Sequence, residues 1–322
     1  MNNRIHTILI AGVGQLGSRY LQGLSQCRSH LRIHLYDISS ESLSQAEQRW
    51  QEVYGPSTHH DVYFSTEIQQ CPQQLDLAIV ATTANSRPEV IRQIAQRSSV
   101  RCWILEKVLA QSAQGLAQIL SYVGTEASAW VNTPRRCVPW HQAIKDKLHL
   151  QSPLHMTVTG GSWGLACNAL HFLDLMAWWS GETLVSINTE QLDDCWFKAK
   201  RAGNWEICGT LVATYTGGAT VKLTSVKNGG PSYFYEIADE NCVWRIDEEN
   251  GSAVSNDGAM ILGHLPYQSE MTTALVDRIL ETGDCKLPTL SISIDIHRVF
   301  VDALFNHWHV HQDSAATSVP IT

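Results

Sequence analysis

The sequence predicts an α/β protein in which a doubly wound parallel sheet is followed by an α+β domain with a mostly antiparallel open sheet. Three observations predict this. Short apolar runs alternate with helix-length stretches over residues 7–126, a glycine-rich turn follows the first run, and several strand-like segments succeed one another from residue 184 onward. Short apolar runs that alternate with helices are typical of β-α-β units, and strands in direct succession are typical of antiparallel sheets.

The N-terminal elements follow from hydrophobic patterning. Segments 75–81 and 102–105 are almost uninterruptedly apolar, as parallel strands covered on both faces should be. Ser39 or Ser40 is placed to cap a polar helix. We expect strands at 7–11, 31–36, 62–64, 75–81 and 102–105, and helices at 18–27, from 39 or 40 to 53, at 87–97 and at 112–126.

The pattern changes after Trp130, which places a domain boundary there and gives domains of residues 1–129 and 130–322. Gly217-Gly218 is well placed to turn a hairpin. The polar tail after Gln312 is expected to fray. We expect helices at 138–148, 166–179, 270–281 and 292–308, and strands at 154–159, 184–190, 206–215, 220–226, 234–237 and 243–246.

Charge and composition exclude several classes of function. The 322 residues carry 23 Lys and Arg against 31 Asp and Glu, a formal charge of −8. This disfavours nucleic acid and anionic membrane surfaces as partners. The absence of a long apolar run and of a leader-like N-terminus predicts a cytoplasmic protein. Nine scattered cysteines without a C-x-x-C pair indicate free thiols, with neither a disulfide framework nor a zinc site.

The glycine-rich turn has the pattern G-x-G-x-x-G, formed by Gly12, Val13, Gly14, Gln15, Leu16 and Gly17. Between a strand and a helix, this pattern is typical of a Rossmann dinucleotide site, in which backbone N–H groups approach a pyrophosphate. Asp37 ends the next predicted strand and is the expected acceptor for ribose hydroxyls. Its charge favours NAD over NADP, although Ser39 and Ser40 would accommodate a 2′-phosphate if Asp37 turned away.

Four further segments resemble the Gfo/Idh/MocA family of nicotinamide-dependent oxidoreductases. They are 81–90 (ATTANSRPEV), 106–110 (EKVLA), 135–139 (RRCVP) and 167–174 (CNALHFLD). The resemblance implies a Rossmann domain joined to an open-sheet substrate domain. The chain departs from the family pattern at four positions, where Thr83 and Val108 replace proline, Arg87 replaces histidine and Cys167 replaces aspartate.

The resemblance also implies site residues. Thr82, Thr83, Asn85, Glu106 and Lys107 are expected to contact the cofactor. Lys107 would stabilise a developing alkoxide and His171 would take the hydroxyl proton, because imidazole titrates near neutrality. Asp174 shares a helix face with His171 and is either catalytic or a support for the helix. The alternative for Lys107 is a solvated surface lysine or one paired with Glu106, and the alternative for His171 is a histidine packed in the core.

Arg136, Trp163, Asn168 and His171 are the candidate substrate contacts. An arginine grips carboxylates or phosphates, an indole stacks on a sugar ring, and an amide binds hydroxyls. For Trp163 core packing is an equal alternative, and at least one of Arg135 and Arg136 is expected in a salt bridge. No metal is expected, because His307, His309 and His311 share a face only in a strand and 292–308 is predicted to be helical.

Together with the glycine loop, the resemblance implies an NAD(P)-dependent oxidoreductase that transfers hydride between nicotinamide and a secondary alcohol or ketone of a sugar, sugar acid or nucleotide sugar. Residues 161–168 resemble family members associated with surface-polysaccharide biosynthesis. The departures leave two alternatives: an enzyme that recycles NAD in a lyase-type reaction, and a non-catalytic dinucleotide-binding regulator. An open sheet leaves an apolar face that a second subunit commonly buries, so we expect a homodimer or homotetramer.

Overall fold

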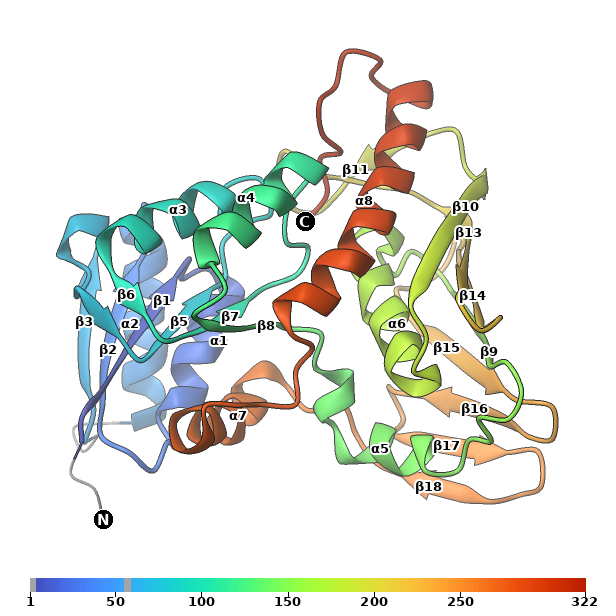
Figure 1. Ribbon diagram of the computed structural model, residues 1–322, viewed down its shortest axis with the longest axis horizontal. Coiled ribbons are helices and arrows are strands. Elements are labelled where there is room, and N and C mark those ends of the chain that lie inside the picture. The colour runs from blue at the N-terminus through green and yellow to red at the C-terminus, as the bar shows by residue number, and fades with distance from the viewer. Residues whose placement is uncertain (1–3, 55–58) are drawn as a thin grey trace. The chain divides into compact units, whose positions relative to one another are not determined.

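A six-stranded parallel sheet forms the centre of the N-terminal unit in the computed structural model, which describes residues 4–54 and 59–322 (Figure 1). The strand order is β3-β2-β1-β5-β7-β8, the doubly wound order. The strands are β1 (His6–Ala11), β2 (Leu31–Tyr36), β3 (Asp61–Ser65), β5 (Leu77–Val80), β7 (Cys102–Leu105) and β8 (Ser128–Val131). Every residue of β5 and β7 is buried, which explains their apolar sequences.

Helices cover both faces of this sheet, α1 and α2 on one side and α3 and α4 on the other (Figure 1). They are α1 (Gln15–Leu24), α2 (Ser40–Tyr54), α3 (Arg87–Arg97) and α4 (Ala113–Val123), with a 3-10 turn η1 (Ile68–Gln70) and the short strand pair β4 (Gln74–Leu75) and β6 (Ser99–Val100). The prediction was wrong for α1, which begins at Gln15 instead of residue 18. The motif's third glycine therefore lies inside the helix.

The second unit is built on an eight-stranded sheet in the order β10-β13-β14-β9-β15-β16-β17-β18. Its strands are β9 (His155–Gly160), β10 (Leu184–Leu192), β13 (Gly209–Tyr215), β14 (Thr220–Ser225), β15 (Tyr233–Ala238), β16 (Val243–Asp247), β17 (Ser252–Ser255) and β18 (Met260–Leu262). Only β14 and β9 pair in parallel within it. The predicted fold class is confirmed.

Helix α6 packs on the inner face of this sheet, where the Tyr215 hydroxyl donates to the Leu173 carbonyl at 2.9 Å and the Phe172 ring meets Tyr235 edge-on. The remaining elements of the unit are η2 (Pro134–Cys137), α5 (Pro139–Lys145), α6 (Leu165–Ser180), α8 (Leu290–His311) and the small strand pair β11 (Phe197–Lys198) and β12 (Trp205–Glu206).

Three predictions about the second half need correction. The single strand expected at 206–215 is two strands, because Gly209 has φ +105° and turns the chain between them. Strands β17 and β18 were not predicted, because their 4 and 3 residues are too few to show a hydrophobic pattern. The tail after Gln312 is packed instead of frayed, since Val319 and Ile321 are fully buried.

The two compact units divide the chain differently from the predicted boundary. The first comprises Met1–Ala110, Ala117–Asn132 and Pro266–Leu290, and the second comprises Gln111–Leu116, Thr133–Leu265 and Ser291–Thr322. Helix α7 (Gln268–Thr282) belongs to the first unit because it packs on α1. The Thr273 hydroxyl donates to the Gly23 carbonyl at 2.6 Å, and the Arg28 guanidinium pairs with Asp277 at 3.0 Å.

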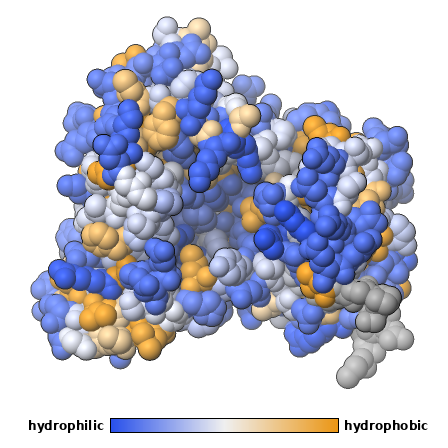
Figure 2. Space-filling model, turned by 180° about the vertical axis from the view of Figure 1, so that it is seen from behind, coloured by the Kyte–Doolittle hydropathy of each residue, from blue (hydrophilic) through white to orange (hydrophobic). Residues whose placement is uncertain are grey.

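Within the described parts of the chain, none of the helices combines the length and the apolar character that crossing a lipid bilayer requires. The face of the molecule in Figure 2 is mostly hydrophilic, with small apolar areas scattered over it.

Candidate functional site

The glycine loop joins β1 to α1 and has the geometry that its sequence predicts. Gly12 has φ +85°, and a Cβ added to it would lie 2.6 Å from the Thr82 backbone nitrogen. A Cβ on Gly17 would lie 2.0 Å from the Gly12 carbonyl oxygen. Only glycine fits either position. A Cβ on Gly14 would meet no described atom within 4 Å, so in this part of the structure the backbone is open to a ligand.

The first turn of α1 begins directly behind this loop. Gly14 is its N-cap, and within the described residues no side chain caps it. Helix N-termini carry partial positive charge and unpaired N–H groups, so this one is suited to an anion. Thr82 Oγ1, beside Gly12, is buried without a hydrogen-bond partner in the part of the chain that the structure describes.

Asp37 lies across the loop, where the sequence predicts it. Its Oδ2 accepts the Val13 N–H at 2.7 Å and its Oδ1 accepts the Ser39 N–H at 2.9 Å. Each carboxylate oxygen has a second lone pair with which to accept a ribose hydroxyl. Ser39 Oγ accepts the Ser42 N–H at 3.1 Å, so this hydroxyl belongs to the start of α2.

Glu106 and Lys107 follow β7 at its carboxyl end. The Glu106 carboxylate is buried and accepts hydrogen bonds from the Tyr20 hydroxyl and the Asn132 amide, both at 2.6 Å. Burial raises the pKa of Glu106 above its usual value and raises that of Tyr20 well above its own. The peptide bond between Lys107 and Val108 is cis, although residue 108 is not proline.

Arg87 connects the two loops that carry the predicted cofactor contacts. Its guanidinium is almost fully buried and donates to the carbonyl oxygens of Thr82 and Val108, and to that of Leu109 at 3.2 Å. Thr83 lies on the first of these loops, and its hydroxyl bonds Asn85 Oδ1 at 2.5 Å. Arg87 stands out in the sequence only as a departure from the family pattern, whereas its contacts make it the link between residues 82–83 and 108–109.

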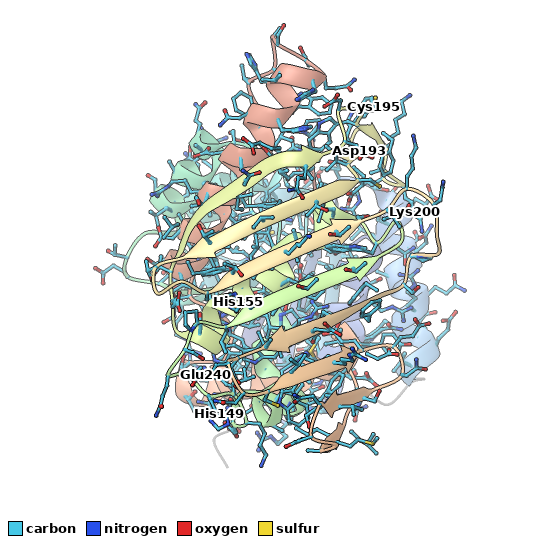
Figure 3. The ribbon with its side chains drawn as sticks, turned by 90° about the vertical axis from the view of Figure 1, so that its right-hand side faces the viewer. His149, His155, Asp193, Cys195, Lys200 and Glu240 are labelled. Carbon is cyan, nitrogen blue, oxygen red and sulfur yellow. The ribbon has the colours of Figure 1, made fainter. Side chains whose placement is uncertain are left out.

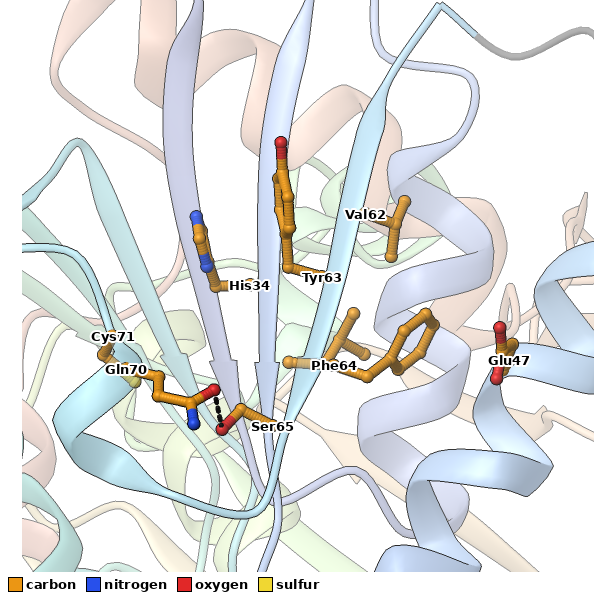
Figure 4. Close-up of a pocket in the computed structure, with 9 residues that line it drawn as sticks. His34, Glu47, Val62, Tyr63, Phe64, Ser65, Gln70 and Cys71 are labelled. Carbon is orange, nitrogen blue, oxygen red and sulfur yellow. Dashed lines mark hydrogen bonds between the residues drawn. The ribbon is translucent and has the colours of Figure 1, made fainter.

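A cavity of about 520 Å³ lies at β3, the edge strand of the parallel sheet (Figure 4). The His34 and Tyr63 rings stack on one side of the strand with centroids 4.8 Å apart, and Val62 and Phe64 project from the other side. The Ser65 carbonyl accepts the Asp37 N–H at 3.3 Å, so one end of the cavity adjoins Asp37. The predicted site residues do not line it.

His171 lies on α6 in the second unit. Cys167, Asn168 and His171 are half-buried, while Ala166, Ala169 and Leu170 are buried. Spacings of three and four residues place the three half-buried side chains on one helix face. The Asn168 amide donates to the Trp163 carbonyl at 2.8 Å.

Asp174 and Arg136 bind each other. The Arg136 Nε donates to Asp174 Oδ2 at 3.1 Å, and its NH2 donates to Oδ1. Burial raises the pKa of Asp174, and the Arg136 guanidinium opposes this. The pair ties α6 to η2, which is the supporting role that the sequence left open for Asp174. The contacts of Arg136 are those of a salt bridge.

Trp163 is also placed in the core. Its indole is 4% exposed, donates to the Thr224 carbonyl at 3.0 Å and meets the Phe172 ring edge-on at 5.6 Å. Of the two interpretations of this residue, its contacts support core packing.

Arg135 lies at the centre of a buried polar cluster. Its Nε and NH2 donate to the two oxygens of Glu248 at 2.8 and 2.7 Å, and the ring of Phe172 lies 4.7 Å beneath the guanidinium. His141 and Tyr235 contact Glu248 Oε1 at 3.0 and 3.1 Å. Although burial favours the neutral acid, the charge of Arg135 holds the pKa of Glu248 well below its usual value.

Glu206 is a carboxylate that sequence analysis missed. Its Oε2 accepts the Ala166 N–H at 2.9 Å and its Oε1 accepts the Cys167 N–H at 3.1 Å, at the start of α6. No local signal marks this residue, because its partners lie about 40 positions earlier in the chain.

The C-terminal histidines lie on a helix, since α8 continues to His311. His307 Nδ1 accepts the Trp196 indole N–H at 3.1 Å, and the His307 and His311 rings stack with centroids 4.3 Å apart. Across residues 4–54 and 59–322, no group of three or more His, Cys, Asp and Glu side chains is arranged to hold a metal ion.

No protein-family model matches the sequence, and no curated protein sequence is significantly similar to it. Solved structures share its fold, and three illustrate the range. UDP-N-acetylglucosamine 3-dehydrogenase GnnA from Acidithiobacillus ferrooxidans is 13% identical with a TM-score of 0.73, covering 97% of this chain and 99% of its own.

The second, myo-inositol dehydrogenase from Lactobacillus casei in complex with NAD(H) and myo-inositol, is 14% identical, covers 96% of each chain and has a TM-score of 0.69. The third, the transcriptional regulator Gal80p from Kluyveromyces lactis, is 15% identical, covers 95% of this chain and 93% of its own, and also scores 0.69. Across nearly its whole length, this chain therefore has the fold that a nucleotide-sugar dehydrogenase, an inositol dehydrogenase and a transcriptional regulator share.

Proposed function

We propose that the protein is an NAD-dependent oxidoreductase that acts on a secondary alcohol or ketone of a sugar, sugar acid or nucleotide sugar, including those of surface-polysaccharide biosynthesis. The glycine loop carries the proposal. Among the residues that the structure describes, the open space at Gly14, the uncapped start of α1 and the unpartnered Thr82 Oγ1 fit a dinucleotide pyrophosphate. The fold agrees, because the Lactobacillus casei relative was solved with NAD(H).

The residues of the chain have separate roles in this proposal. The nicotinamide, when bound, accepts or donates the hydride. His171 takes the hydroxyl proton of the alcohol, and Lys107 stabilises the negative charge that develops on its oxygen. Asn168 binds a neighbouring hydroxyl, and Asp174 and Arg136 hold α6 in place through their ion pair.

Asp37 makes NAD the preferred cofactor. Two backbone N–H groups fix its carboxylate across the loop, and a 2′-phosphate in the same place would meet a like charge. Ser39, the alternative phosphate contact, accepts the Ser42 N–H with its hydroxyl oxygen and keeps its own proton to donate to a phosphate.

The first test is a fluorescence titration with NADH and NADPH. We expect tight NADH binding and at least about tenfold weaker NADPH binding, a difference of ~1.4 kcal/mol in binding free energy.

Gly14→Ala is expected to raise the NADH Kd by about tenfold or more with an unchanged Tm, because its methyl group enters space that only the ligand needs. The control is Gly230→Ala, where an added Cβ also meets none of the described atoms within 4 Å. An unchanged NADH affinity in Gly14→Ala would remove the loop from the site.

The Kluyveromyces lactis match supports a second candidate, a regulator that binds the dinucleotide without chemistry. It predicts NADH binding and no hydride transfer to UDP-N-acetylglucosamine, myo-inositol or scyllo-inositol. An enzyme that recycles bound NAD would consume substrate without net change in the reduced-nicotinamide absorbance. Product analysis beside that absorbance separates all three.

We also propose a homodimer or homotetramer built on the outer face of the eight-stranded sheet. Figure 3 shows this face with its side chains toward the viewer, His155 among them. The face presents threonines and the 54% exposed Phe234. Light scattering is expected to give at least about twice 35.9 kDa.

Phe234→Lys is expected to shift the mass toward one chain, because burying an unpaired charge in an interface is costly. Val310→Lys, at a 74% exposed position on α8, is the control. A wild-type mass of one chain would overturn this part of the proposal.

A further inference from the structure

The start of α6 is held by a carboxylate from another element. Glu206, on β12, accepts the N–H groups of Ala166 and Cys167 with its two oxygens, at 2.9 and 3.1 Å. The N–H groups in the first turn of a helix lack partners within the helix, and a negative charge there also complements the helix dipole. Gly164 is the N-cap residue, with φ +80°. Within the described residues, no local side chain caps this helix start. Glu206 therefore takes the role that a local cap usually has.

The same turn carries the half-buried polar face of α6. Cys167 is one of the two residues whose N–H groups Glu206 binds, and it lies one helical turn before His171. Asn168, the next residue, is fixed by its own bond to the Trp163 carbonyl. Fraying of the first turn would therefore displace the face on which His171 lies.

Glu206 is itself fixed by contacts with distant parts of the second unit. The backbone N–H of the neighbouring Trp205 donates to the Pro320 carbonyl at 2.8 Å. The Trp205 indole meets the Trp308 ring edge-on, with ring centroids 5.4 Å apart. Val319 and Ile321, on either side of Pro320, are fully buried. Strand β12 is thus anchored on a packed segment, which gives the carboxylate a defined position.

We propose that Glu206 is a positioning residue for the reaction: it fixes the first turn of α6 and, through that turn, the orientation of His171. This rests on the proposed role of His171. Glu206→Ala removes both acceptors, whereas Glu206→Gln keeps one acceptor oxygen at nearly the same size, so the alanine variant should show the larger effect.

The matched control is Glu182, at the opposite end of the same helix. Its Oε2 accepts the N–H groups of Gly217 and Ala219 at 2.6 and 3.1 Å, so it too binds two backbone donors. These donors belong to the β13–β14 turn, away from the face that carries His171. Glu182→Gln is expected to leave α6 and the turnover unchanged.

Two measurements on the protein alone test the positioning. Amide hydrogen exchange in a peptide covering 165–171 is expected to rise by about fivefold or more in Glu206→Ala and less in Glu206→Gln. The rate at which diethyl pyrocarbonate modifies His171, read by peptide mass spectrometry, is expected to change by about threefold or more in the same order. Wild-type values in both variants would overturn the proposal.

Turnover supplies the third readout, with UDP-N-acetylglucosamine or myo-inositol as substrate and NAD as cofactor. The kcat is expected to fall by about tenfold in Glu206→Ala with little change in KM or NADH affinity. A displaced base stabilises the transition state less but leaves the binding of substrate and cofactor unchanged. A Glu206→Ala enzyme with unchanged kcat overturns this proposal, whereas unchanged kcat in His171→Ala overturns the proposed function instead.

Discussion

Replacing His171 with alanine is expected to lower kcat by about 10²- to 10⁴-fold, the usual contribution of a positioned general base. NADH affinity should stay unchanged, because the glycine loop and Asp37 belong to the other unit of the chain. The reason is chemical. An alcohol loses its proton as its hydride departs, and the half-buried His171 on α6 carries the side chain that most often serves as a general base. Steady-state turnover and a fluorescence titration measure the two effects.

His155→Ala is the matched control for this experiment. His155 lies on the outer face of the sheet, where its Nδ1 and the Thr220 hydroxyl are 2.8 Å apart. Its removal should leave kcat unchanged. Equal turnover in wild type and His171→Ala would refute the assignment of the base. A wild-type protein that binds NADH and turns over none of the tested sugars would favour the regulator.

The second large effect is on stability, and its source is the buried Arg135–Glu248 pair. Glu248→Gln is expected to lower the free energy of unfolding by about 3–5 kcal/mol, because the variant leaves the Arg135 charge buried without its counter-ion. The side chains are 6% and 4% exposed, so water does not replace the lost partner. His141 and Tyr235 lose part of their hydrogen bonding in the same step. Urea unfolding followed by circular dichroism and tryptophan fluorescence measures the change.

The exposed pair of Arg245 and Glu236 is the control. These side chains are 78% and 35% exposed and 2.7 Å apart, and solvent screens them. Glu236→Gln should therefore cost at most about 1 kcal/mol. If both variants lost a similar amount of unfolding free energy, burial would not be the reason that the Arg135–Glu248 pair stabilises the protein. Because the two units need not unfold together, both probes are compared for coincident transitions.

The sequence by itself determined most of the parallel sheet of the first unit and the place of its glycine loop. Five strands and four helices of that unit lie within a few residues of their predicted ranges, since apolar period and glycine positions are local properties of the chain. Gly12 and Gly17 have the close backbone approaches that their spacing predicts, because a strand, a turn and a helix leave a short segment little freedom. Asp37 directly follows β2, as its spacing from the loop predicts.

Only the tertiary structure decided which partners the charged residues take and where the chain's later segments pack. Arg136 binds Asp174, Arg135 binds Glu248 and Glu206 holds the start of α6, in pairs that are 38, 113 and 40 positions apart. Helix α7 joins the first unit, and Val319 and Ile321 are buried. Such contacts depend on which surfaces meet after folding, and local periodicity and spacing carry no information about that meeting.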